Sequence, residues 1–304
     1  MSLLARYIAG EHDAVWEALE SAPDAADAEA VMRETFARVA RNTDTVITRL
    51  RDTGYRFECE AGRYSDAVPP HRQISVHLGR IEETLEDRFG DLPAFAGRSD
   101  FLPRALDLFA RVVGIIDLRQ RHPGKPPQAG ITARTPVQRA LENALSGLGG
   151  TDARRRVVET EDRRPHLSDD PVIARLGDWN PLVINLEYLS DIGAEMEAEL
   201  VPHPMGGLGL MAEIAPSFEH KANVSGTTGA HLFLPSQRVS PMIFEHGPPA
   251  SFIDYLRTAF AHGGFLGVPA PVRPSHAELT QIAPQVLLPD HPVFVSLAKD
   301  LEPF

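Results

Sequence analysis

Near the start of the chain, apolar residues recur at steps of three and four over some twenty residues. The repeated positions are Val31 or Met32, Phe36, Val39, Thr43, Val46 or Ile47, and Leu50. This spacing is typical of an amphipathic helix that buries one face. Asp24 is the expected N-cap, because its carboxylate can accept from the free amide groups of a first turn. Gly54 suits the other end, because glycine readily adopts the left-handed conformation that stops a helix.

The same spacing predicts further helices. Residues 74–89 repeat the pattern up to Gly90, and a shorter helix is expected over 11–20. Leu102–Val113 reads as a helix with Pro103 in its first turn, where a missing amide hydrogen costs nothing. Ser251–His262 predicts a helix that ends at two glycines, and Glu187–Leu200 fits one as well.

Short apolar runs bounded by turn residues predict strands in the second half of the chain. They lie at 115–118, 182–184, 208–214, 230–234 and 241–245. The last three are separated by short turns, which favours an antiparallel meander. The expected fold class is therefore α+β, with N-terminal helices packed on a mostly antiparallel sheet and a closing C-terminal helix.

Composition and the positions of proline predict the domain organisation. With 43% hydrophobic residues, the composition is that of an ordinary globular protein. We expect an N-terminal helical segment over 1–70 and an α+β domain over 71–268. Proline-broken residues 121–180 are predicted to be an insertion in that domain. Residues 269–304, also proline-rich, are expected to pack as a tail on its surface.

Charge and composition exclude several classes of function. The net charge of −12 disfavours binding to a phosphate backbone. An arginine-rich stretch at 151–170 is nearly neutral, because its five arginines face six acidic residues. No apolar run approaches the ~20 residues that span a bilayer, and no signal-peptide core is present, so a cytoplasmic location is expected. The single cysteine, Cys59, excludes an internal disulfide and a cysteine-rich zinc site.

Several segments taken together resemble a known family. They are IEETLEDRFGDL (81–92), LPRALDLFARVVGIID (102–117), NPLVI (180–184) and FIDYLRTAFAHGGF (252–265). A Leu-Pro-x-x-Leu-x-x-Phe helix, strands and a closing Phe-Ile-Asp-Tyr-Leu helix follow one another. This order resembles the SUKH superfamily, the Smi/Knr-like group of yeast cell-wall regulators and bacterial immunity proteins. The chain looks like a bacterial member with an extra N-terminal helical segment.

The resemblance implies a binding protein that performs no chemistry of its own. Immunity proteins of this group block a toxin by covering its active surface, and a basic partner would meet an acidic surface here. Acidic residues gather on two predicted helix faces, at Glu82, Glu83, Glu86 and Asp87 and at Glu187, Asp191, Glu195, Glu197 and Glu199. The residues expected to bind the partner are Glu187, Asp191, Glu195, Glu213 and Glu245. The alternative interpretation of these acidic residues is a helix face that is simply exposed to solvent and binds no partner.

A second hypothesis is a small-molecule-binding or hydrolytic enzyme. It would use histidine and acidic residues between positions 213 and 262, namely His220, His231, His246, His262, Glu213, Glu219, Glu245 and Asp254. None of them has the spacing of a known metal or catalytic motif. The sequence therefore predicts no catalytic residue, no metal and no cofactor, and leaves the choice between binder and enzyme open.

Overall fold

The fold is built from helices that come mainly from the two ends of the chain and strands that come from its middle. The computed structural model describes residues 1–23, 25–60, 67–74, 78–91, 102–121, 176, 180–187, 189, 200–202, 208–215, 230–234, 239–244, 250–266 and 292–304. Its α-helices are α1 (Leu3–Ile8), α2 (His12–Ser21), α3 (Ala28–Asp52), α4 (Leu78–Phe89), α5 (Arg104–Val112), α10 (Phe252–Ala261) and α11 (Pro292–Ala298).

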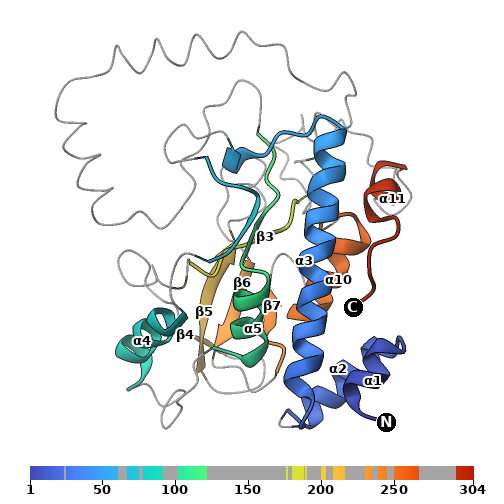
Figure 1. Ribbon diagram of the computed structural model, residues 1–304. Helices are drawn as coiled ribbons and strands as arrows, with labels where there is room; N and C mark the ends of the chain where they lie inside the picture. The colour runs from blue at the N-terminus through green and yellow to red at the C-terminus, as the bar shows by residue number, and fades with distance from the viewer. Residues whose placement is uncertain are drawn as a thin grey trace, which may run out of the picture.

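Helix α3 is the 25-residue helix that the opening apolar pattern predicts, and it runs along most of the molecule (Figure 1). Its predicted face is buried, and the hydroxyl groups of two threonines in that face form hydrogen bonds within the helix. Thr35 Oγ1 donates to Val31 O and Thr43 Oγ1 to Val39 O, each one turn back. Asp24 lies outside the described residues. Asp27 occupies the N-cap position of α3, but its carboxylate accepts from the backbone amide of Leu4 at 2.9 Å and so caps α1.

An aromatic cluster joins three helices at the centre of the core. The Phe36 ring of α3 lies edge-on to Phe109 of α5, with 5.6 Å between centroids, and 6.4 Å from Phe252 of α10. Phe109 and Phe252 complete the triangle at 5.0 Å. All three side chains are fully buried. The alignment of these helices is therefore set by burial of large apolar rings, which dominates the stability of such cores.

The strands form two antiparallel sheets. β1 (His71–Arg72), β2 (Ile115–Asp117) and β3 (Val183–Ile184) make the smaller one, in that order. The larger sheet has the order β4 (Leu200–Pro202), β5 (Leu208–Ala215), β6 (Ala230–Leu234), β7 (Met242–Phe244) and β8 (Ala250–Ser251). The backbone amide of Asn185 donates to Ile214 O at 2.8 Å and links the two sheets. Figure 1 shows the larger sheet behind α5.

Gly114 makes the turn from α5 into β2. Its φ is +89°, and a Cβ on it would stand 2.3 Å from Arg72 O, so no other residue fits without moving β1. The helix break predicted at this residue is confirmed. The predicted helix start is one position off: Pro103 occupies the N-cap position of α5 rather than its first turn.

The described residues confirm the α+β class and the antiparallel meander of β5, β6 and β7. One boundary is wrong. Leu200 begins β4 and pairs with Leu210 of β5, so it is not the last residue of the helix predicted over 187–200. Most of that segment, and most of the predicted insertion at 121–180, lies outside the described residues. Among the helices that the structure describes, none has both the length and the apolar character needed to cross a membrane.

The described end of the predicted C-terminal tail lies against the helical side of the molecule (Figure 1). Residues 292–304, called the strap below, comprise α11 and the residues that follow it to the end of the chain. The strap buries Phe294, Leu297 and Phe304, each no more than 5% exposed. It therefore contributes to the core formed by α3 and α10.

Candidate protein-binding surfaces

The predicted acidic set is only partly visible. Glu187 follows β3 and is 6% exposed, and its backbone amide donates to Asn185 Oδ1 at 2.9 Å. Of Glu213 the structure describes the backbone position in β5. Asp191, Glu195 and Glu245 lie outside the described residues. The buried Glu187 does not face solvent, and an acidic surface built from the other four remains a prediction.

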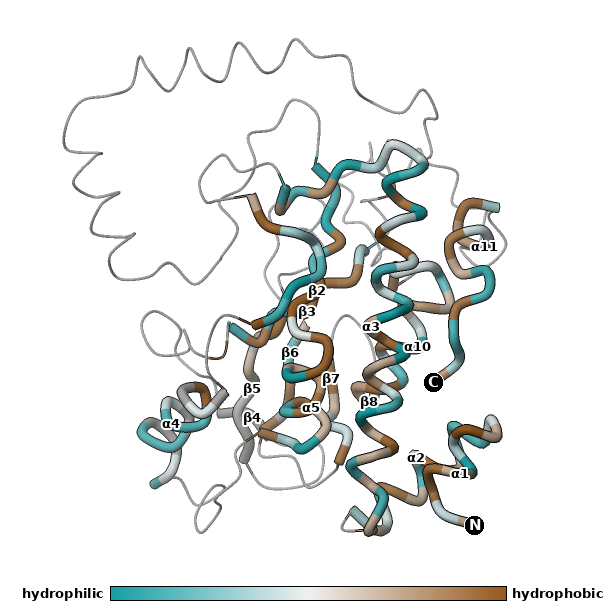
Figure 2. Tube along the Cα trace, in the orientation of Figure 1, coloured by the Kyte–Doolittle hydropathy of each residue, from teal (hydrophilic) through white to brown (hydrophobic). Residues whose placement is uncertain are grey.

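A different acidic ridge lies on α4. Glu83, Glu86 and Asp87 are exposed, and their spacing of three and four residues places them on one face of the helix. None of these three carboxylates forms an ion pair within the part of the chain that the structure describes. Figure 2 shows hydrophilic residues along much of α4. We call Glu83, Glu86 and Asp87 the α4 acidic face.

Ile81 anchors α4 to the rest of the protein. Its side chain is fully buried in the hydrophobic core, whereas the α4 acidic face is exposed. The helix is thus held by an apolar contact, and the three carboxylates of the α4 acidic face contribute no ion pair to that attachment in the described structure. Charge is therefore concentrated on α4 without a structural use that these contacts reveal.

The charges of α3 are arranged in the opposite way. Glu29 pairs with Arg33 at 2.7 Å and Glu34 with Arg38 at 2.9 Å, both one turn apart. The hydrogen bond from Arg33 lowers the pKa of Glu29. Arg41 reaches Glu34 at 3.5 Å and also holds Glu302 of the strap. Each α3 carboxylate in this row therefore has a nearby cation.

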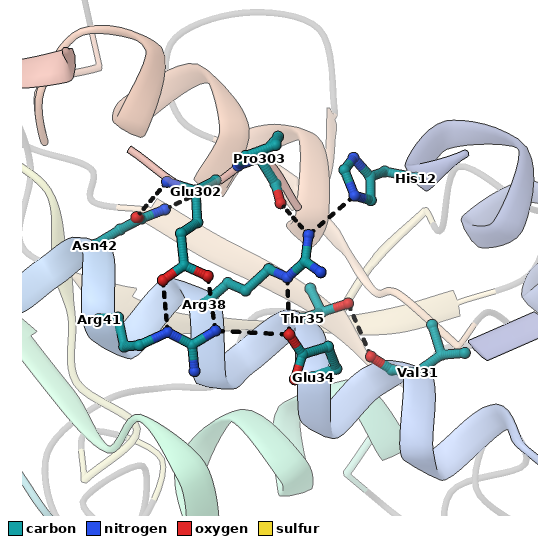
Figure 3. Close-up of polar contacts among 9 residues, drawn as sticks. All are labelled: His12, Val31, Glu34, Thr35, Arg38, Arg41, Asn42, Glu302 and Pro303. Carbon is teal, nitrogen blue, oxygen red and sulfur yellow. Dashed lines mark hydrogen bonds and ion pairs between the residues drawn. The ribbon is translucent and has the colours of Figure 1, made fainter. Parts of the chain in front are cut away.

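Side chains of α3 bind the main chain of the strap (Figure 3). Asn42 forms two bonds with the backbone of one residue: its Nδ2 donates to Glu302 O, and its Oδ1 accepts from Glu302 N, both at 2.8 Å. Arg38 Nη1 donates to Pro303 O at 2.8 Å. Arg49 Nη1 donates to Leu297 O at 2.8 Å, at the C-terminal end of α11. We call this row of side chains, with Arg41, the strap-binding face.

Glu302 adds the strap's own charge to these contacts. Both oxygens of its carboxylate accept from Arg41, from Nε at 2.6 Å and from Nη2 at 2.7 Å. This two-bond geometry is the strong arrangement for a guanidinium and a carboxylate. The bond from Arg41 lowers the pKa of Glu302, and the same contact raises the pKa of Arg41.

His12 joins α2 to this network. Its Nε2 lies 3.1 Å from Arg38 Nη1, and because arginine only donates, Nε2 must accept. The ring is then neutral, with its proton on Nδ1. Burial, followed by the charges of Arg38 and Arg257, lowers the pKa of His12. The Arg38 guanidinium thus binds both His12 and the strap. It also stacks over the Tyr7 ring, with 5.0 Å between Arg38 Cζ and the ring centroid.

The residues of the enzyme hypothesis are brought together only in part. The register places Glu213 of β5 directly opposite His231 of β6, which is 8% exposed. Directly opposite positions share one face of an antiparallel sheet. His262 at the end of α10 is elsewhere engaged, with Nδ1 2.9 Å from Thr258 O. His220, Glu219, His246 and Glu245 lie outside the described residues.

Two further groups of chemical interest have structural surroundings. Burial, reinforced by the charge of Asp117, raises the pKa of the Cys59 thiol, which keeps it protonated and weakly nucleophilic. Burial also acts to raise the pKa of Asp117, but Arg119 outweighs it and holds that pKa below its usual range. Within the described ranges, no three His, Cys, Asp or Glu residues are grouped so that they could hold a metal ion.

Comparison of the chain with protein-family models, with curated proteins and with solved structures gives no match. The resemblance to the SUKH superfamily therefore rests on the sequence segments alone.

Sequence reasoning missed the strap-binding face, although one signal was present. Asn42 interrupts the apolar stripe of α3 and is 2% exposed. A buried amide needs hydrogen-bond partners, so an asparagine in that stripe indicates another segment packed on the helix. The identity of that segment could not be read from the pattern, because its partner is 260 residues away in the chain.

Proposed function

We propose that the protein is a non-enzymatic binding protein that captures a basic protein partner through an acidic surface. The observation that carries the proposal is the α4 acidic face, where Glu83, Glu86 and Asp87 are exposed and have no cationic partner in the described structure. The resemblance to SUKH immunity proteins supports a toxin as the class of partner, blocked by occlusion of its active surface. In this arrangement the finer fold is a SUKH-like sheet domain with N-terminal helices packed on it.

The physical basis is long-range attraction. Like charges on one helix face repel one another by a few tenths of a kcal/mol per pair, which a cationic partner would relieve. A net charge of −12 adds a field that steers a basic protein toward the surface and raises its association rate. Such contacts mainly set rate and specificity, and salt weakens them because the Debye length is about 8 Å at physiological ionic strength.

The test compares two matched double variants. Glu86→Gln with Asp87→Asn removes two charges from the α4 acidic face. Glu17→Gln with Asp52→Asn removes one glutamate and one aspartate charge elsewhere, at exposed positions that likewise lack an ion pair in the described structure. Tagged wild-type protein is used to capture partners from the native cell, and association with the recovered protein is measured at several salt concentrations.

The α4 variant is expected to associate about tenfold more slowly at low salt and to show a weaker salt dependence. The matched variant should behave nearly as the wild type. Recovery of no protein partner, or equal slowing by both double variants, would remove the support for this proposal.

The enzyme hypothesis is retained as the second candidate, because the register pairs Glu213 with His231 across β5 and β6. It predicts hydrolysis of a small ester or amide probe that is lost in His231→Asn and unchanged in His262→Asn, whose ring is held by Thr258 O. Absence of turnover over a broad probe panel, or equal activity of wild type and His231→Asn, would count against it.

A further inference from the structure

The strap is held by two kinds of contact that differ in what they recognise. Between Leu297 and Pro303, the backbone of the strap is bound by side chains of Asn42, Arg38 and Arg49. These bonds do not depend on the side chains of the strap. Arg257 of α10 is a fourth residue that binds the strap backbone, with Nε donating to Phe304 O at 2.6 Å. Among the described residues, the pair between Arg41 and Glu302 is the one strap contact that depends on a charged side chain of the strap.

Apolar anchors lie on both sides of these polar contacts. Phe294 packs on Phe265 with 5.5 Å between ring centroids, and Phe304 packs on Phe260 at 5.7 Å. Leu297 fits against Gly263, where a Cβ would lie 2.2 Å from Leu297 Cβ. The strap therefore carries a complete set of anchors and fits its site as a docked peptide does.

The connection between α10 and the strap is long. Residues 262–291 join α10 to α11, and the 25 residues from 267 to 291 could span up to about 80–90 Å if fully extended. All the strap bonds described above reach α3 or α10, at positions 47 or more residues away in the chain. The strap of a second copy would make the same bonds and bury the same rings, which is the condition for exchange of an identical element.

We propose that the strap-binding face also receives the strap of a second copy of this chain, so that the protein forms a strap-exchanged dimer. The occupant is residues 292–304 of the other copy, docked through the contacts described for the closed chain. Because no new interface is required, the balance between closed monomer and exchanged dimer depends on concentration, with the linker setting the effective concentration of the chain's own strap. This inference is independent of the α4 acidic face.

A charge-swap experiment tests it on the full-length chain. Arg41→Glu places like charges on the helix and its own strap, and Glu302→Arg does the same with the signs reversed. When the two variants are mixed, exchange restores an opposite-charge pair at both sites. The two substituted side chains meet at one site, and the native Arg41 and Glu302 meet at the other. We expect a 1:1 dimer in analytical ultracentrifugation that neither variant forms alone at the same concentration.

The double variant Arg41→Glu with Glu302→Arg is the matched control, because it restores the pair within one chain. It should resemble the wild type and not respond to mixing. If the mixture stays monomeric while circular dichroism shows both single variants folded, the proposal is overturned.

A second measurement covers the case in which a single variant does not fold. In a Cys59→Ser background, a donor dye on Val295→Cys of one copy and an acceptor dye on Thr48→Cys of another report strap exchange directly, since both positions are exposed. Energy transfer that grows with concentration and is competed away by unlabelled protein supports exchange. Its absence at high concentration contradicts it.

Discussion

Helices α3 and α4 are predicted by the same apolar spacing, yet they use their polar faces in opposite ways. On α3, Glu29 and Glu34 are paired with arginines one turn away, and Arg38, Arg41 and Asn42 bind the strap. On α4, three neighbouring carboxylates are exposed without a cation in the described structure. Periodicity thus predicts which face of a helix is buried, but the role of the other face depends on what the rest of the chain supplies.

The largest effect is expected where α3 enters the core. Phe36→Ala should lower the free energy of unfolding by about 3–5 kcal/mol, because it removes a fully buried ring that contacts Phe109 and Phe252 and leaves a cavity. Urea denaturation followed by circular dichroism measures the change. Ile8→Ala, at a side chain that is 62% exposed, should change little. Equal losses in both variants would mean that the aromatic cluster does not align the helices.

The second effect concerns the strap. Asn42→Ala should cost about 1–3 kcal/mol, because it removes both bonds to the backbone of Glu302 and leaves those backbone groups without their partner. Proteolysis within the strap should rise in parallel. Thr48→Ala is a suitable control on the same helix, since its hydroxyl donates to Asp44 O one turn back and the described residues show no bond from it to the strap. A strap as protease-resistant in Asn42→Ala as in wild type would show that its apolar anchors alone hold it.

Local signals made much of this fold predictable. Apolar spacing was enough to predict the buried face of α3, and short apolar runs bounded by turn residues were enough to predict the meander of β5 to β7, because both patterns follow from local geometry. Leu200 was assigned wrongly because an apolar residue at a helix end looks the same as the first residue of a strand. Its pairing with Leu210 is a tertiary event that a single apolar position does not encode.

The candidate surfaces were harder to predict, for a related reason. Glu187 was expected at an acidic surface but is buried beside Asn185, since acidity in the sequence does not reveal exposure. The acidic residues of α4 were visible as charges, but so were those of α3. The pairs within α3 follow from a spacing of four residues, but the pair between Arg41 and Glu302 could not be predicted, because it joins residues 261 positions apart in the chain.

The third prediction concerns pH and the α3 network. The hydrogen bond from Arg38 to His12 forms only while the imidazole is neutral. The groups that face this ring are Tyr7, Asp13, Arg38 and Arg257. Histidine in an unfolded chain has a pKa of about 6.5, and the folded pKa is lower, so the unfolded chain takes up the proton first. Stability should therefore be full above about pH 6.5, fall as the pH drops from there toward the folded pKa, and then level off.

His12→Gln is the control for this titration, because its amide oxygen can still accept from Arg38 while no proton is exchanged. Unfolding in urea at a series of pH values should show a flatter profile for this variant between about pH 6.5 and the folded pKa of His12. The stability contributed by Glu29 and Glu302, whose pKa values are lowered, is lost over a separate pH range, below the ordinary carboxyl pKa of about 4. Identical profiles for wild type and His12→Gln would show that this histidine does not couple α2 to the strap-binding face.

The smallest effect on stability is expected at the α4 acidic face, and it separates the two helices most directly. Glu86→Gln with Asp87→Asn should change the free energy of unfolding by less than about 0.5 kcal/mol, because exposed carboxylates without partners contribute little to folding. Glu34→Gln on α3 should cost about 1 kcal/mol, since it leaves the 13%-exposed Arg38 without its carboxylate. Urea denaturation at low and high salt measures both. If the α4 pair costs as much as Glu34→Gln, those carboxylates stabilise the fold, and the acidic face is then not a surface kept free for a partner.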